Sequence, residues 1–141
     1  MNGVVVLLSL RRLGPRGARA ERIVLAVFLA SMPLVYTSTW YRAGVGGSIG
    51  IEVAGLVLFA ILALIGATRA PWVLVIGIAA HGLWDLAHHR RSAFMPDWYA
   101  IGCAIVDAGV AIYAASRVGR WRESSGIPGN GGVAPNPNPS R

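Results

Sequence analysis

Four long runs of apolar residues divide the chain, and polar or charged residues bound each of them. The runs cover residues 23–40, 48–67, 71–88 and 97–116. A helix needs about 20 residues to cross a hydrocarbon core of roughly 30 Å, or slightly fewer where its end residues reach toward the headgroups. Because backbone amides in lipid must bond within their own segment, each run is predicted to cross the bilayer as a helix.

The connections between the four runs are short, at residues 41–47, 68–70 and 89–96. Short connections favour antiparallel packing of consecutive helices. We therefore predict an all-α fold, a four-helix up-down transmembrane bundle with short loops over residues 23–116. Pro33 lies inside the first run, where a proline removes a backbone donor and clashes with the preceding turn, so a kink is expected near residues 29–31.

The two ends of the chain differ from this domain. Residues 1–22 hold five arginines and a seven-residue apolar run, 4–10, that is too short to cross; it fits a surface-lying segment or a start codon assigned too early. Residues 117–141 are basic at first and then rich in Gly, Pro, Ser and Asn. We expect a basic cytoplasmic segment at the amino end and a disordered tail at the carboxyl end.

Composition supports a membrane protein. Of 141 residues, 55% are hydrophobic and 13% charged, and the mean hydropathy is +0.55, which is more apolar than soluble domains of this size. The net charge of +7 comes from thirteen arginines and no lysine, and almost all of them lie outside the apolar runs. Phospholipid headgroups account for that distribution, so we expect the lipid bilayer and no nucleic acid as partner. The single cysteine excludes an internal disulfide framework.

The arginines also predict the orientation of the chain. Ten of them lie in the amino-terminal segment, the loop 68–70 and the carboxyl tail, whereas three lie in the other two loops. Cytoplasmic loops carry the excess of arginine and lysine. We therefore expect a multi-pass protein of the inner (plasma) membrane with both termini in the cytoplasm.

Ionisable residues inside the predicted spans are uncommon and energetically costly, which makes each a functional candidate. They are Glu52 in the second run, His81, Asp85 and His88 in the third, and Asp107 in the fourth. At a rise of about 1.5 Å per residue, all fall in the non-cytoplasmic half of the bilayer. The sequence predicts a polar pocket that opens to that side, while the cytoplasmic half is expected to be nearly all apolar. Further candidates for the pocket are Cys103, Trp84 and Tyr36.

Metal binding is the chemistry that this set fits best. His81, Asp85 and His88 share one helical face, and carboxylates on neighbouring helices can complete a site. We predict a divalent metal, zinc or iron or manganese, with the ligand candidates Glu52, His81, Asp85, His88 and Asp107. Haem is not expected, because two histidines on one helix cannot approach the iron from opposite faces.

Several functions remain open for such a site. The first is a membrane-embedded metal-dependent enzyme in which a spare carboxylate activates water. The second is a binding or transport module for a small cation or a lipid headgroup, without turnover. The third is a structural subunit whose acids pair with a partner helix, in a homo-oligomer or with another membrane protein. A purely structural hydrogen-bond network is the plainest alternative, with Cys103 as a packing residue and the tryptophans as interface anchors.

The runs AHGLWDLAHH and MPDWYAIGCAIVDAG, together with the glutamate in IEVAG, resemble a family of small bacterial four-span integral membrane proteins with no assigned activity. The resemblance covers the second to fourth runs, and leaves the first run and both tails outside. It implies no reaction, but it implies that the family shares the polar positions Glu52, His81, Trp84, Asp85, His88, Cys103 and Asp107.

Overall fold

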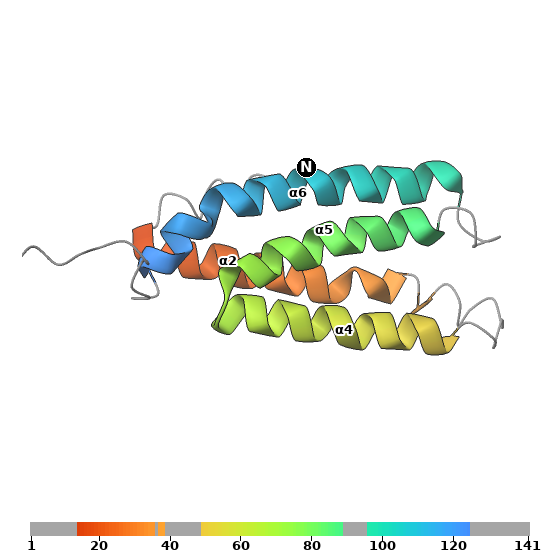
Figure 1. The fold of residues 1–141 in the computed structure, drawn as a ribbon, viewed down its shortest axis with the longest axis horizontal. Helices are drawn as coiled ribbons and strands as arrows, with labels where there is room; N and C mark the ends of the chain where they lie inside the picture. The colour runs from red at the N-terminus through yellow and green to blue at the C-terminus, as the bar shows by residue number, and fades with distance from the viewer. Residues whose placement is uncertain (1–13, 36, 39–48, 89–95, 125–141) are drawn as a thin grey trace, which may run out of the picture.

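The computed structural model describes residues 14–35, 37–38, 49–88 and 96–124. Within these residues all regular structure is helical, which confirms the all-α prediction for this part of the chain. The helices are α2 (Gly14–Ser31), α4 (Ile49–Thr68), α5 (Pro71–His88) and α6 (Asp97–Ser124), and they lie side by side along one long axis (Figure 1).

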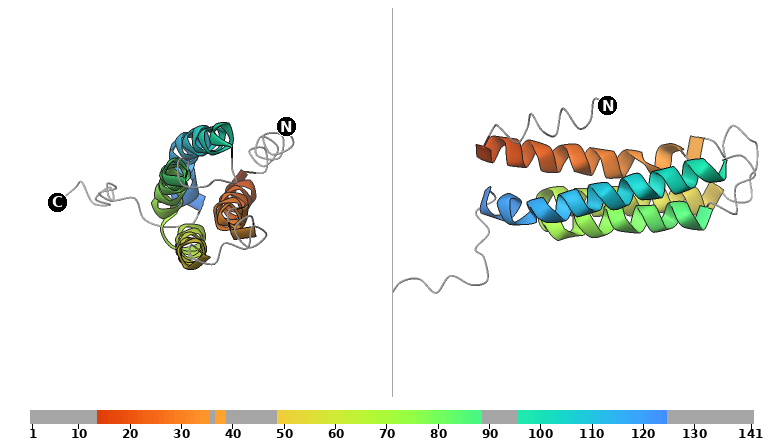
Figure 2. Two further views of the ribbon diagram at one scale, coloured as in Figure 1. Left: turned by 90° about the vertical axis from the view of Figure 1, so that its right-hand side faces the viewer. Right: turned by 90° about the horizontal axis from the view of Figure 1, so that it is seen from above.

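The helices surround a common centre when viewed along that axis (Figure 2). The most extensive interface joins α5 to α6, followed by those of α4 with α5 and of α2 with α4. The start of α2 and the end of α6 lie at the same end of the molecule (Figure 1). This arrangement places α6 next to both α5 and α2. Each of these two pairs of helices is joined by a buried polar contact that is described below.

The bounds of α4 and α5 lie within one residue of the predicted runs, whereas α2 begins and ends earlier than its run and α6 ends later than its run. The first helix begins at Gly14 rather than at residue 23, and the last continues to Ser124 rather than ending at residue 116. Buried apolar residues at helical spacing explain both extensions: Ala18 near the start of α2, and Val118 and Trp121 near the end of α6. Parts of the basic segment and of the basic tail are therefore packed helix.

Pro33 interrupts the first helix close to the predicted kink. The helix α2 ends at Ser31, Met32 adopts a turn, and residues 33–35 and 37–38 are again helical. The Met32 amide still donates to the carbonyl of Phe28 at 3.1 Å. Proline has no amide to donate, so the regular hydrogen-bond pattern stops at this point. As a result, Met32 and Val35 lie beside a pocket that faces α6.

Glycines permit close packing of α4 against α5 at two levels. A Cβ on Gly66 would lie 2.7 Å from the Cβ of Leu74, and one on Gly55 would lie 2.9 Å from the Trp84 ring. Real Cβ atoms essentially never approach so closely, so a side chain at either position would force the helices apart. The approach at Gly55 matters for the site, because it seats Trp84 next to Phe59.

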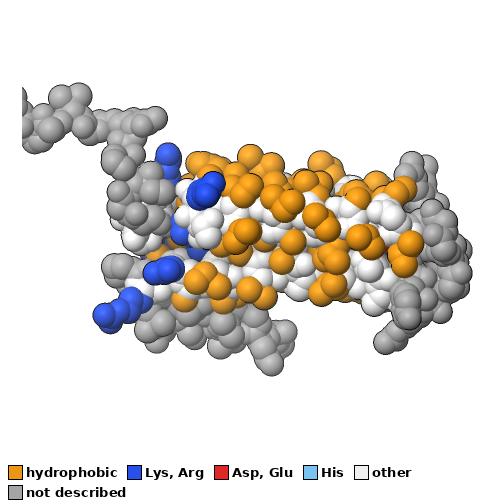
Figure 3. Space-filling model, turned by 90° about the horizontal axis from the view of Figure 1, so that it is seen from below, with side chains coloured by type: hydrophobic (Ala, Val, Ile, Leu, Met, Phe, Trp, Pro, Cys, Tyr) orange, Lys and Arg blue, Asp and Glu red, His pale blue; other side chains and the backbone are white. Residues whose placement is uncertain are grey.

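Large apolar side chains cover the outside of the described bundle, whereas several ionisable side chains are buried within it. Figure 3 shows the apolar side chains spread along the body of the bundle and arginines gathered at one end. By length and composition, Ile49–Thr68 and Asp97–Ser124 could cross a membrane, and Pro71–Ala87 is a shorter apolar helix. The most exposed large apolar residues include Val27, Leu64, Ile76, Leu83, Ile105 and Ile112.

Candidate metal centre

Three ionisable side chains meet between α5 and α6. His81 and Asp85 lie one turn apart on α5, and Asp107 faces them from α6; their exposed fractions are 3%, 0% and 1%. Nδ1 of His81 lies within hydrogen-bond distance of Oδ2 of Asp107, at 2.8 Å. The same nitrogen lies 3.6 Å from Oδ2 of Asp85. One imidazole nitrogen is thus shared between two buried carboxylates.

A glycine beside His81 allows the two helices to approach closely enough for this contact. A Cβ on Gly82 would lie 3.1 Å from the Cβ of Asp107 and 3.4 Å from the carbonyl oxygen of Ala104. The α5–α6 interface is therefore tight at the level of the carboxylate. Any side chain at position 82 would push against Asp107.

Aromatic rings close the site on the side of α4. The Phe59 ring meets the His81 ring edge to face, with centroids 4.9 Å apart and an interplanar angle of 68°. Trp84 packs against the same phenylalanine at 6.0 Å and 84°. These contacts orient the imidazole and shield it from solvent, and Phe59 is itself buried in the core.

Two buried polar atoms of the group have no hydrogen-bond partner in the described part of the chain. They are Nε2 of His81 and Oδ1 of Asp107. Buried polar atoms of this kind are uncommon, because each has lost its hydration without a replacement. Nε2 of His81 and Oδ1 of Asp107 could therefore each still bind a further group, such as a metal ion.

The spacing of the group suits a divalent ion. His81, Asp85 and Asp107 each offer one ligand atom, and these atoms all lie within 4.8 Å of one another. Ligands bound tetrahedrally at about 2.0–2.2 Å would be separated by roughly 3.3–3.6 Å. The distances of 2.8 and 3.6 Å from His81 Nδ1 to the two carboxylates bracket that range. Only small side-chain shifts would therefore be needed to hold a metal.

A pocket of about 270 Å³ adjoins the three residues and lies between α5, α6 and the α2 side of the bundle. Cys103, which is half-buried, lines this pocket one turn before Asp107. The helix α4 contributes no lining residue, so the pocket faces away from it. Besides His81, Asp85, Asp107 and Cys103, the lining consists of Phe28, Met32, Val35, Tyr99, Gly102 and Val106.

The other predicted site residues have different positions. Glu52 is buried, with 2% of its surface exposed, but it lies outside the His81 group. Trp84 is half-buried beside Phe59. His88 is the last residue of α5, and the position of its side chain lies outside the described part. Tyr36 also lies outside the described residues. The structure therefore assembles part of the predicted ligand set.

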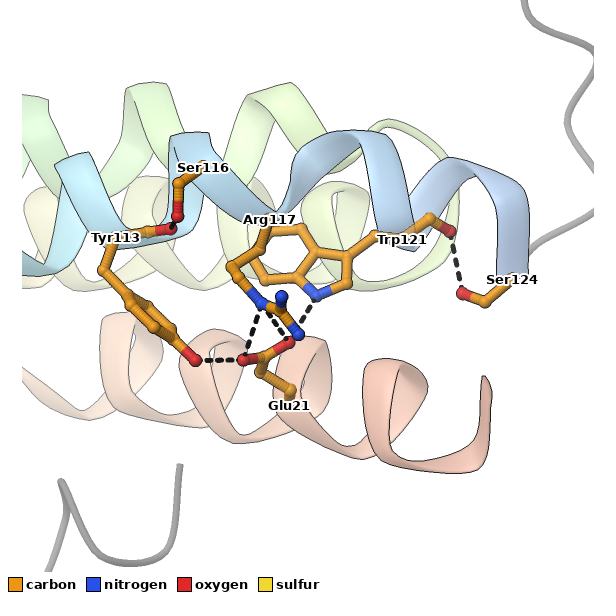
Figure 4. A network of polar contacts seen from close by, with 6 residues as sticks. All are labelled: Glu21, Tyr113, Ser116, Arg117, Trp121 and Ser124. Carbon is orange, nitrogen blue, oxygen red and sulfur yellow. Dashed lines mark hydrogen bonds and ion pairs between the residues drawn. The ribbon is translucent and has the colours of Figure 1, made fainter. Parts of the chain in front are cut away.

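A second polar cluster joins the first half of α2 to the second half of α6 (Figure 4). Glu21 of α2 has no exposed surface. Its carboxylate accepts hydrogen bonds from Arg117 Nε at 3.1 Å to each oxygen and from Trp121 Nε1 at 2.9 Å. The Tyr113 hydroxyl donates to it as well. The prediction of a nearly all-apolar cytoplasmic half covered the runs within residues 23–116, and Glu21, Arg117 and Trp121 lie just outside that range.

The sequence held a signal for this cluster that hydropathy did not detect. Tyr113, Arg117 and Trp121 are spaced four residues apart, so they share one face of α6, and Glu21 is the one acid among the first 22 residues. Arg117 was assigned to the headgroup-facing arginines, but it is buried. Its carboxylate partner is 96 residues away, a pairing that no local pattern reveals. Both carboxylate oxygens of Glu21 accept hydrogen bonds, and these bonds join α2 to α6. Glu21 therefore has no oxygen left to bind a metal ion.

A family model described as a family of unknown function (DUF6010) matches residues 2–120. The match covers most of the chain, which therefore belongs to this family. It includes the first helix and the amino-terminal segment, which the resemblance in the sequence had left outside. Searches of curated proteins and of solved structures give no match.

Proposed function

We propose that this member of the DUF6010 family is a multi-pass membrane protein that holds a divalent metal ion at His81, Asp85 and Asp107 and acts as a membrane-embedded metal-dependent enzyme. The four helices would form an up-down bundle with both termini in the cytoplasm. The buried His/Asp/Asp group is the observation that carries this proposal.

The distribution of side chains supports the membrane location. Large apolar residues such as Leu64, Ile76 and Ile112 are more than half exposed, while His81, Asp85 and Asp107 are buried. Contiguous apolar surface of this kind is rare on soluble monomers and favourable against lipid. The 18 residues of α5 would extend about 27 Å, close to the hydrocarbon thickness.

Charge balance favours a metal over a purely structural network. With both carboxylates ionised, two aspartates beside one imidazole would carry a net negative charge in either form of the imidazole. The arginines of the described residues lie in the first half of α2, directly after α4 and in the last third of α6, and none of them lines the adjoining pocket. Uncompensated charge in a low-dielectric interior is strongly unfavourable. A divalent cation with neutral His81 would bring the group to zero net charge.

The pocket favours catalysis over simple storage of an ion. Structural zinc sites are usually closed by four protein ligands, whereas catalytic sites have three and leave a position for water or substrate. Three ligands come from the described residues here, and the pocket of about 270 Å³ adjoins them. A metal in this position would activate bound water or polarise a substrate oxygen.

Elemental analysis of the purified full-length protein tests the proposal. We expect close to one divalent ion per chain in the wild type and less than a tenth of that in Asp85→Asn and Asp107→Asn. Asp97→Asn, at the exposed start of α6, is the matched control and should retain the ion. A wild-type protein without a stoichiometric metal after purification in metal-supplemented buffer would exclude the metal function.

A further inference from the structure

The pocket beside the candidate metal centre has two chemically different ends. At the inner end lie the buried side chains of His81, Asp85 and Asp107. At the outer end lie Val35 and Val106, which are 40% and 55% exposed. A ligand that fills the pocket would therefore meet ionisable groups at one end and an apolar surface at the other.

The walls between these ends offer little to a polar solute. Phe28 and Met32 line the side of the first helix, and Cys103 lines the side of α6. Apart from the inner group, no charged side chain among the described residues lines the pocket, and Tyr99 supplies the one hydroxyl. Binding of a sugar or a nucleotide would need several more polar partners, since each buried polar group requires one.

The opening of the pocket is continuous with the apolar outside of the bundle. Val106 follows Ile105, which is 67% exposed, on the outer surface of α6. On the first helix the rim residue Val35 follows Leu34, which is 49% exposed. If the chain spans the bilayer, this rim contacts acyl chains. In that case the inner group lies about 5 to 15 Å from the nearest ends of α5 and α6, with Asp85 nearest to an end and Asp107 deepest.

We propose that the pocket admits an amphiphilic lipid from within the bilayer, between the first helix and α6, with its acyl chain along Val35 and Val106 and its polar group at His81, Asp85 and Asp107. This inference rests on the proposed function and assigns its substrate class. The volume of about 270 Å³ fits one chain segment or a small polar group, and does not accommodate a whole diacyl lipid.

Gly102 provides a way to block the pocket without disturbing the helices. It lines the pocket, and a Cβ at this position would meet no atom within 4 Å. A phenylalanine there would add bulk at the pocket wall without a clash at its Cβ. Gly109 lies on the same helix, is exposed and also has nothing within 4 Å of a Cβ, but it does not line the pocket. Gly109→Phe is therefore a matched control.

The single cysteine reports which compounds enter the pocket. Full-length protein would be reconstituted in vesicles of phosphatidylcholine and phosphatidylglycerol. Mass spectrometry would then measure the rate at which Cys103 is modified. The two probes are a dodecyl maleimide, which partitions into the bilayer, and a sulfonated maleimide, which does not. We expect the dodecyl probe to react at least tenfold faster, after correction for their reactivities toward a free thiol.

The variants then locate the route of entry. Gly102→Phe should slow the dodecyl reaction at least tenfold, whereas Gly109→Phe should change it less than twofold. Val106→Trp, at the rim, is a second blocking variant should Gly102→Phe not fold. Equal rates for both probes, or blocking variants that react like the wild type, would overturn lipid entry.

The metal content of the same samples separates this inference from the proposed function. Gly102→Phe should keep its metal, because residue 102 supplies no ligand. A wild type that shows the dodecyl preference but no metal would refute the metal centre and keep the lipid pocket. A wild type that contains metal but shows no preference for the dodecyl probe would refute the lipid pocket and keep the metal centre.

Discussion

The Nδ1 atom of His81 lies 2.8 Å from Oδ2 of Asp107, across the interface between α5 and α6 and 26 residues apart in the chain. This contact brings residues from two different helices together into one site. It depends on the glycine at position 82, which brings Asp107 within reach. The site can therefore be tested through the packing of the helices as well as through its ligands.

Substitution of Gly82 by valine should weaken the site without removing a ligand. The new side chain would press on Asp107, whose Cβ would lie 3.1 Å from the added Cβ. Overpacking of this kind costs about 1–3 kcal/mol of stability. We expect metal affinity to fall at least tenfold, as measured by competition with a fluorescent chelator. Gly109→Val, in open space on α6, should retain wild-type affinity; equal affinity in both variants would contradict the packing argument.

Metal addition should stabilise the folded protein. A ligand that binds only the folded state at a concentration of 100 Kd stabilises it by about 2.7 kcal/mol. Stripping the purified protein with a chelator should therefore lower its unfolding temperature, and zinc or manganese should restore it. The double variant Asp85→Asn/Asp107→Asn should show no such response, because it loses both carboxylate ligands. A wild-type unfolding curve that is unchanged by chelator and metal would count against a metal in the core.

Glu52→Gln should keep the metal. Glu52 is buried, but it lies outside the group formed by His81, Asp85 and Asp107. The variant removes one negative charge and preserves the shape of the side chain. We expect wild-type metal content by elemental analysis, and Asp85→Asn purified in parallel provides the metal-deficient reference. Loss of the ion from Glu52→Gln would show that a fourth ligand comes from α4.

Arg117→Met should destabilise the protein more than the double variant Glu21→Gln/Arg117→Met. The single change leaves the carboxylate of Glu21 buried without its guanidinium, and breaking one partner of a buried pair costs roughly 3–5 kcal/mol. The double change removes both charges. Unfolding in a detergent titration measures the difference. Metal content should not change in either variant, because Arg117 lies ten residues after Asp107 in α6, about 15 Å farther along the helix.

A carboxyl-terminal fusion tests the orientation in the membrane. Green fluorescent protein fused after Arg141 should fluoresce in a bacterial host, since it folds in the cytoplasm, and alkaline phosphatase at the same position should be inactive. The excess of arginine on this side of the chain is the physical reason. The reverse pattern, an active phosphatase and a dark fluorescent fusion, would invert the proposed topology.

The helical class, the bounds of α4 and α5, and the interruption near Pro33 were all predictable from the amino-acid sequence. These features depend on local properties: apolar length, short connections and the missing amide of proline. It also predicted that His81, Asp85 and Asp107 lie toward the same end of their helices, because a helix rises by a constant amount per residue.

Which of these side chains meet depends on how the helices pack in three dimensions. The rotation of each helix about its axis is set by packing against its neighbours, so depth alone could not separate Asp107, which contacts His81, from Glu52, which does not join the group. The Glu21–Arg117 pair was likewise beyond sequence patterns. Hydropathy averages a whole segment, whereas a buried charge depends on one partner that folding brings from the far end of the chain.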